Sequence, residues 1–245
     1  HMPSQESKEI FQDIVFNPDH PLRARAIALL GENPIVAASW HVEQWLPDLD
    51  PKGAALMATT LGCIDTPQSS QALARLLEHD DENVRIAAYR GLAPLARPSE
   101  LPTIANALSQ ESGKAREVGR NAIASMSDKA IDIIIARRLG TPNMSDDVHL
   151  VYLQAAADRR ISRANDALFA SASTDDRKIA SESLEALSEI CTGVDTKRLL
   201  DLLLNRKSKS VRLKAADAIV VSARRAHSGP AAGKVRAAFS QADAD

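Results

Sequence analysis

A short residue pattern recurs seven times along the chain, and its spacing constrains the fold more than any other feature. Its clearest copy is Asp81, Val84, Arg85, Ala88 and Leu92. The apolar site that follows each capping residue falls at Leu22, Gly53, Val84, Ala115, Val148, Asp176 and Val211, so successive copies are 31, 31, 31, 33, 28 and 35 residues apart. A repeat of this length is typical of a solenoid, in which each unit stacks on its neighbours.

The pattern also predicts what each repeat contains. Apolar residues such as Leu73, Leu76 and Leu77 precede the motif at helical spacing, and alternating strand-like runs are absent from the sequence. Asp or Ser opens the second helix of each pair, at Asp19, Asp50, Asp81, Ser112, Ser145, Ser173 and Ser208. We therefore expect an all-α fold of seven antiparallel helix pairs, followed by a last helix from about Pro230 to Ser240.

The motif Asp-x-x-Val-Arg-x-x-Ala-x-x-x-Leu resembles HEAT-like repeats of the short, phycobilisome-lyase type, and the resemblance covers nearly the whole chain. It implies a right-handed α-α superhelix that forms one solenoid over residues 1–245. Bacterial proteins of this kind are mostly scaffolds and binding modules. The sixth and seventh repeats are also similar to HEAT segments inside large multidomain proteins of environmental bacteria, which implies a segment of a larger protein.

Composition narrows the classes of function. Thirty Lys and Arg residues against 32 Asp and Glu give a net charge of -2, and aromatic residues make up only 3% of the chain. This balance disfavours binding to duplex nucleic acid by the chain as a whole. The longest apolar run, 130–136, is too short for a membrane span. The sequence shows no signal peptide, so we favour a cytoplasmic protein. His1-Met2 resembles a cloning remnant, which leaves open an export signal removed upstream.

The two cysteines lie four repeats apart in the sequence. Neighbouring helices pack about 10 Å apart, so Cys63 and Cys191 are expected to be roughly 40 Å apart. A disulfide needs Cα atoms within about 7 Å. We therefore expect both thiols to be unbonded to each other.

A basic residue follows the apolar site in most copies, at Arg23, Arg85, Arg116, Arg177 and Arg212. This row of arginines has two interpretations: a track for anions, or structural side chains that pair with the capping Asp of a neighbouring repeat. We favour the structural interpretation, because long Arg side chains pack along helices while their head groups pair locally.

Basic residues outside the motif define the candidate partner-binding site. Arg90, Arg120 and Arg159 fall on the second helices of the middle repeats, whereas Glu182, Glu185 and Asp217 hold comparable places near the C-terminus. Tyr89 is expected near the same surface. Trp40 lies one position outside the core register occupied by Trp45, so it is either an exposed interface anchor or a packing residue.

No catalytic, cofactor-binding or metal-binding residue is predicted. Deoxyhypusine hydroxylases carry His-Glu pairs on this repeat fold, but no histidine here precedes glutamate. No glycine-rich phosphate loop is present in the sequence either. We therefore expect a protein that is not an enzyme and needs no cofactor.

The leading hypothesis is a non-catalytic, monomeric module that binds a protein or peptide, for which the basic residues favour an acidic partner. Two alternatives remain: a nucleic-acid-binding protein similar to HEAT-like DNA glycosylases, and a bilin-lyase-like subunit that handles a chromophore. The scarcity of aromatic residues counts against both. Two further expectations concern packing and helix starts. The first helix is expected to pack only on the helices at residues 22–30 and 35–46. Asp176 is expected in a first helical turn, where the helix amides stabilise its carboxylate.

Overall fold

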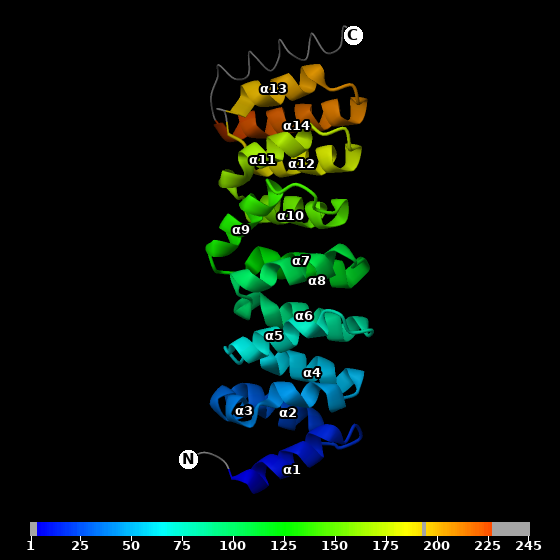
Figure 1. Ribbon diagram of the computed structural model, residues 1–245, viewed down its shortest axis with the longest axis vertical. Helices are drawn as coiled ribbons and strands as arrows, with labels where there is room; N and C mark the ends of the chain where they lie inside the picture. Colours follow the sequence, from blue (N-terminus) through cyan, green and yellow to red (C-terminus); the bar gives the residue numbers. More distant parts are fainter. Residues whose placement is uncertain (1–3, 193–194, 227–245) are drawn as a thin grey trace. The chain divides into compact units, whose positions relative to one another are not determined.

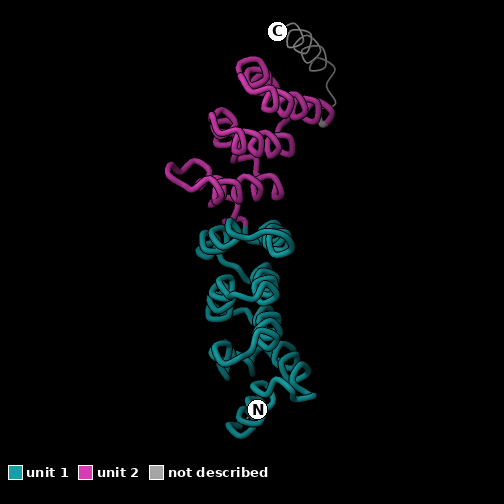
Figure 2. The backbone as a smooth tube through the Cα atoms, turned by 90° about the vertical axis from the view of Figure 1, so that its right-hand side faces the viewer, with its two compact units in different colours: residues 1–128 teal, residues 129–245 magenta. Residues whose placement is uncertain are grey.

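The computed structural model describes residues 4–192 and 195–226, and every regular element within these ranges is a helix (Figure 1). The all-α prediction is therefore confirmed. The predicted helix from Pro230 to Ser240 lies outside the described residues. The chain divides into two compact units, residues 1–128 and 129–245 (Figure 2). The single array over residues 1–245 stays a prediction.

The first unit consists of successive helix pairs. Its helices are α1 (Gln5–Phe16), α2 (Arg23–Glu32), α3 (Pro34–Trp40), α4 (Pro51–Leu61), α5 (Pro67–Leu76), α6 (Glu82–Leu95), α7 (Leu101–Ser109) and α8 (Gly113–Ser125), with short 3-10 helices η1 (Val42–Asp48) and η2 (Pro98–Glu100). The second helices α2, α4, α6 and α8 pack each against the next. The first helices α5 and α7 pack on the second helices α6 and α8.

The second unit repeats the arrangement. Its helices are α9 (Ala130–Leu139), α10 (Asp146–Asp158), α11 (Asn165–Ala172), α12 (Arg177–Ile190), α13 (Thr196–Asn205) and α14 (Lys209–Ala226), with the 3-10 helix η3 (Ser162–Ala164). Here α10, α12 and α14 are the second helices that pack in succession. Each unit thus buries its apolar faces between neighbouring repeats.

Small residues allow the second helices to approach closely. A Cβ atom added at Gly91 in α6 would lie 2.9 Å from the backbone oxygen of Ala58 in α4. It would also lie 3.0 Å from a methyl group of Leu73, which is fully buried. A glycine is therefore required where α6 crosses α4 and α5.

The first helix packs on its nearest neighbours, as predicted. The ring of Phe11 lies 5.3 Å from the ring of Trp40 in α3, and Phe16 lies 5.9 Å from Trp45 in η1. The expected helix between residues 35 and 46 is interrupted, however. His41 adopts a left-handed conformation with φ 54°, which ends α3 and begins the 3-10 helix.

The sixth copy of the motif lies three residues further along the chain than the sequence pattern predicts. Asp176 is the exposed N-cap of α12, and its carboxylate accepts a hydrogen bond of 2.8 Å from the backbone amide of Ile179. The buried apolar residue is Ile179, not Asp176, and Ser173 instead ends α11. From Val148 to Ile179 and from Ile179 to Val211 the intervals are then 31 and 32 residues, so the period is nearly constant. The expectation that helix amides stabilise the Asp176 carboxylate is confirmed.

Candidate partner-binding site

The motif arginine of the first repeat has a structural role. The Arg23 side chain is buried, and its Nε donates a hydrogen bond of 2.7 Å to the backbone oxygen of Val15. Its guanidinium also pairs with the carboxylate of Asp50, the N-cap of α4. The hydrogen bond from Arg23 lowers the pKa of Asp50. This is the predicted pairing of a motif arginine with the capping Asp of the next repeat.

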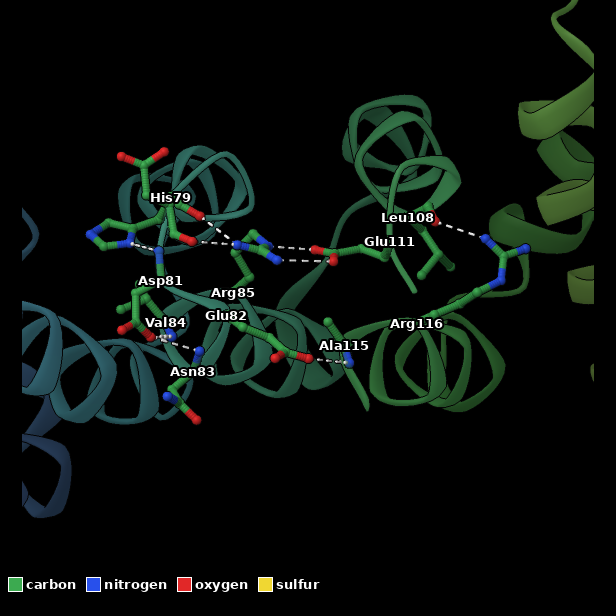
Figure 3. Close-up of polar contacts among 11 residues, drawn as sticks. His79, Asp81, Glu82, Asn83, Val84, Arg85, Leu108, Glu111, Ala115 and Arg116 are labelled. Carbon is green, nitrogen blue, oxygen red and sulfur yellow. Dashed lines mark hydrogen bonds and ion pairs between the residues drawn. The ribbon is translucent and has the colours of Figure 1, made fainter. Parts of the chain in front are cut away.

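The motif arginine of the third repeat bridges two first helices rather than pairing with a cap. Arg85 donates to the backbone oxygens of His79 and Asp80 at 2.9 Å each, just beyond the end of α5 (Figure 3). On its other side it forms two hydrogen bonds, of 2.7 and 3.2 Å, with the carboxylate of Glu111 after α7. This hydrogen bonding to Glu111 raises the pKa of Arg85. Arg116 likewise donates to the Leu108 backbone oxygen at 3.1 Å, so these side chains are engaged within the fold.

Trp40 and Tyr89 are packing residues, which corrects their assignment as candidate contact residues. Trp40 is 6% exposed and stacks on Trp45 with ring centroids 6.4 Å apart. Tyr89 is fully buried, and burial raises the pKa of its hydroxyl. A Cβ atom at Gly119 in α8 would lie 3.0 Å from the Tyr89 ring, so the absence of a side chain there makes room for the tyrosine.

Arg159 is also engaged within the fold. It is the C-cap of α10 in the second unit, and its Nε donates a hydrogen bond of 2.6 Å to the Asp132 carboxylate of α9. Its side chain is only 8% exposed. Charge neutralisation and burial therefore make Arg159 a structural residue rather than the contact residue that we expected. Glu185 is similarly paired, with Lys214 of α14 at 3.0 Å.

Arg90 and Arg120 are exposed on α6 and α8, as expected. Arg120 already has an interaction within the structure. Arg90, by contrast, has no hydrogen-bond or ion-pair partner within residues 4–192 and 195–226. Of the predicted contact residues, Arg90 is thus the one that is both exposed and without a polar contact in the described part of the chain.

Arg90 borders an open cleft of about 640 Å³ between α4 and α6. The cleft floor includes the half-buried apolar side chains of Leu56 and Ile86, and Lys52 lies at its edge as a second exposed cation. Sequence reasoning missed Lys52, Leu56 and Ile86. The sequence does contain a signal for these residues, because each lies within one helical turn of a buried motif position on a second helix.

The carboxylates beside this cleft are occupied by other contacts. The Asp50 carboxylate pairs with Arg23, and the Asp81 carboxylate accepts hydrogen bonds of 2.8 and 3.4 Å from the amides of Asn83 and Val84 as the N-cap of α6 (Figure 3). Lys52, like Arg90, has no ion-pair partner in the described part of the chain. Among the charged lining residues of the cleft, Lys52 and Arg90 are therefore the two without a polar contact in the described part of the chain, and they lie beside half-buried apolar side chains.

A metal site, a membrane-spanning helix and a disulfide each require an arrangement that the described residues do not show. They contain no group of three or more His, Cys, Asp or Glu side chains placed to hold a metal ion. None of their helices is long and apolar enough to cross a membrane. Cys63 and Cys191 are both free thiols, which confirms that they are not bonded to each other.

Comparison with known proteins identifies the repeats. Residues 41–127, which include α4, α6 and the cleft between them, match the family model for HEAT repeats. The match covers this segment and not the whole chain. No curated protein matches the sequence.

Several solved structures resemble the chain. The complex of CpcE and CpcF of phycocyanin lyase from Nostoc sp. PCC7120 is 18% identical, with 99% of this chain and 97% of that chain covered at a TM-score of 0.44. An engineered protein is 17% identical over 96% of this chain and 72% of its own, also at 0.44. A second engineered protein is 17% identical over 90% and 98% of the two chains, at 0.37.

Proposed function

We propose that this HEAT-repeat chain is a non-catalytic module that binds an acidic, partly apolar segment of a partner protein in the cleft between α4 and α6. The observation that carries the proposal is the set of available groups in that cleft. Lys52 and Arg90 flank Leu56 and Ile86, while the neighbouring carboxylates are already paired or capping a helix. An acidic side chain on either side of an apolar one would complement this arrangement.

The cleft favours a weak, reversible contact. It is open and shallow, and both cations are exposed, so their attraction for a ligand is screened by solvent and salt. Duplex DNA is a poorer fit than an acidic peptide. Nearly balanced charge over the whole chain would not hold a long phosphate backbone at physiological salt.

A fluorescence-anisotropy titration tests the proposal. The probe is a labelled octapeptide of Glu, Asp, Leu and Ala residues, and its basic counterpart with Lys and Arg is the comparison. We expect Arg90→Glu to weaken binding of the acidic peptide about tenfold, equivalent to about 1.4 kcal/mol. Arg75→Glu is the matched control, because Arg75 is an exposed arginine on α5 that does not line the cleft.

Two outcomes would overturn the proposal. One is acidic-peptide binding that Arg75→Glu weakens as much as Arg90→Glu does, because the attraction would then reflect only overall charge. The other is sub-micromolar binding of random duplex DNA at physiological salt that is abolished by Arg90→Glu combined with Arg120→Glu. That result would assign the surface to nucleic acid.

A further inference from the structure

A second cleft of the first unit lies between the first helices α5 and α7. Its volume is about 640 Å³, its apolar wall includes Ala74, Leu77 and Ala107, and its polar groups include Glu78, Asp80 and Glu111. Arg85 holds the carboxylate of Glu111 (Figure 3). The carboxylates of Glu78 and Asp80 are exposed and have no hydrogen-bond or ion-pair partner in the described ranges. The available charge in this cleft is therefore negative, opposite to that of the cleft between α4 and α6.

The second unit contains the equivalent cleft, between α11 and α13. The equivalence follows from the repeat, because a constant offset of 95 residues relates the lining positions of the two clefts: Ala74 to Phe169, Glu78 to Ser173, Thr103 to Arg198, Asn106 to Asp201, Ala107 to Leu202, Gln110 to Asn205 and Glu111 to Arg206. The same backbone surface is thus lined by different side chains in the two units.

In the second unit this cleft already holds a guanidinium group. The Arg198 guanidinium lies 3.8 Å from the centre of the Phe169 ring, and its Nη1 donates a hydrogen bond of 2.9 Å to the carboxylate of Asp166. Cation-π contact and a charge-assisted hydrogen bond together position it. The clefts between first helices are therefore able to seat an arginine side chain.

The cleft between α5 and α7 lacks this internal arginine. Thr103 stands where the second unit has Arg198, and Ala74 stands where it has Phe169. Both replacements are smaller and leave the cleft open. With Glu111 in place of Arg206 and Glu78 in place of Ser173, the charged lining changes from two arginines and two aspartates to three carboxylates and one arginine, Arg85, which is bound to Glu111.

We propose that the cleft between α5 and α7 binds an arginine or lysine side chain from a basic segment of a partner protein. The stem of that side chain would lie on Ala74, Leu77 and Ala107, and its charged group would meet Glu78 and Asp80. This inference does not rest on the proposed binding of an acidic segment, because it uses a different cleft with groups of the opposite charge.

Charge neutralisation provides the first test. A labelled octapeptide of Arg, Lys, Ala and Ser is titrated against the full chain by fluorescence anisotropy. We expect Glu78→Gln combined with Asp80→Asn to weaken binding at least about fivefold. The matched control is Glu6→Gln combined with Asp13→Asn, which removes the same charge from exposed positions on α1. Equal weakening by both double variants, or no binding of the peptide by the wild-type chain, would overturn the proposal.

A variant whose own side chains fill the cleft provides the second test. Thr103 is exposed and Ala74 is half-buried, so Thr103→Arg combined with Ala74→Phe should fold and place a guanidinium on the new ring, as Arg198 lies on Phe169. Gln71 stands where the second unit has Asp166, so only the ring contact is reproduced. We expect loss of basic-peptide binding, whereas Thr103→Val should bind as the wild type does. Acidic-peptide binding should be unchanged in these variants, so failure here is distinguishable from failure of the proposed function. Full basic-peptide binding by the filled variant would contradict the proposed location.

Discussion

At the scale of single residues, several polar side chains join one repeat to the next. Arg23 links α1 to the N-cap of α4, and the buried hydroxyl of Thr60 in α4 donates a hydrogen bond of 2.9 Å to the backbone oxygen of Ile27 in α2. A buried polar group that loses such a partner costs about 1–3 kcal/mol. Such pairing is shown for the motif arginines Arg23, Arg85 and Arg116, which are therefore not free to bind an anion.

His149 occupies the position that holds arginine in other repeats, and it makes stability depend on pH. Its Nε2 lies 3.0 Å from the hydroxyl of Ser171, which is buried. Burial lowers the pKa of His149 below its usual 6.5, although the charge of Asp146 opposes this shift. The unfolded chain therefore binds a proton at a higher pH than the folded chain does.

We predict that this contribution of His149 to the free energy of unfolding is fully present above pH 6.5 and is lost as the pH falls through the lower, folded-state pKa. Urea unfolding at pH 7.5 and pH 5.5 measures the loss. His149→Gln keeps a hydrogen-bonding group but no titration, so the variant should lose less stability between the two pH values. An equal loss in both proteins would refute the assignment.

At the scale of helices, the predicted capping residues mark the start of the second helix in some repeats but not in all. Asp81 and Asp176 cap α6 and α12 through their carboxylates, as the preference of Asp for N-caps implies. Asp50 also stands at an N-cap, but its carboxylate pairs with Arg23 instead of an α4 amide. Asp19 caps no helix, because α2 begins at Arg23 and its N-cap is Leu22. Leu22, the predicted apolar site of this copy, is 57% exposed.

The N-cap of α12 provides a test of the corrected register. We predict that Asp176→Ala lowers the free energy of unfolding by about 1 kcal/mol, because the amide of Ile179 loses its acceptor. Asp175→Ala, which removes the same charge from the adjacent exposed residue, should have an effect below about 0.5 kcal/mol. Chemical denaturation of both variants decides the matter, and equal effects would argue against a capping role for Asp176.

The crossing of α4 and α6 provides a second test at this scale. A methyl group at Gly91 would meet the Ala58 backbone oxygen and the Leu73 side chain at 2.9 and 3.0 Å. We predict that Gly91→Ala destabilises the chain by about 1–3 kcal/mol, although alanine is the better helix former. Gly31→Ala is the control, because its nearest neighbour would lie at an ordinary 3.6 Å. A stabilised Gly91→Ala variant would show that the helices can move apart at little cost.

At the scale of the whole molecule, helices pack mainly on helices of the same repeat or of the next one. The principal contacts join α2 to α4, α4 to α6 and α6 to α8 in the first unit, and α10 to α12 and α12 to α14 in the second. In such an array stability is close to a sum of repeat and nearest-neighbour terms. A local defect should therefore have a local effect.

Hydrogen exchange tests this locality. We predict that Leu73→Ala, which creates a cavity in the fully buried core beside α6, speeds amide exchange in α4, α5 and α6. Protection in α12 and α14 should stay at the wild-type level, since their contacts lie within the second unit. A uniform loss of protection over both units would indicate one cooperative domain instead.

The sequence by itself determined the helix pairs and their order, because a period near 31 residues and an apolar face at helical spacing are local properties of the chain. It also predicted the structural role of the motif arginines. The sixth copy was placed wrongly because Ser173-Asp176-Ala180-Leu184 matches the pattern at the cap and at the two later sites, although Asp176 is not apolar. Asp176-Ile179-Ser183-Leu187 has an apolar residue at that site and restores a 31-residue interval, and the burial of Ile179 confirms this register.

Which side chains remain available to a partner was decided by the tertiary structure alone. Arg90 and Arg159 are the same residue type on comparable helices, but only Arg159 has a carboxylate within reach, supplied by Asp132, which lies 27 positions earlier. Tyr89 is buried because Gly119 in the next repeat makes room for its ring. Exposure and pairing depend on residues that are distant in sequence and adjacent in space, so a periodic pattern could place these side chains on helices but could not tell which of them were free.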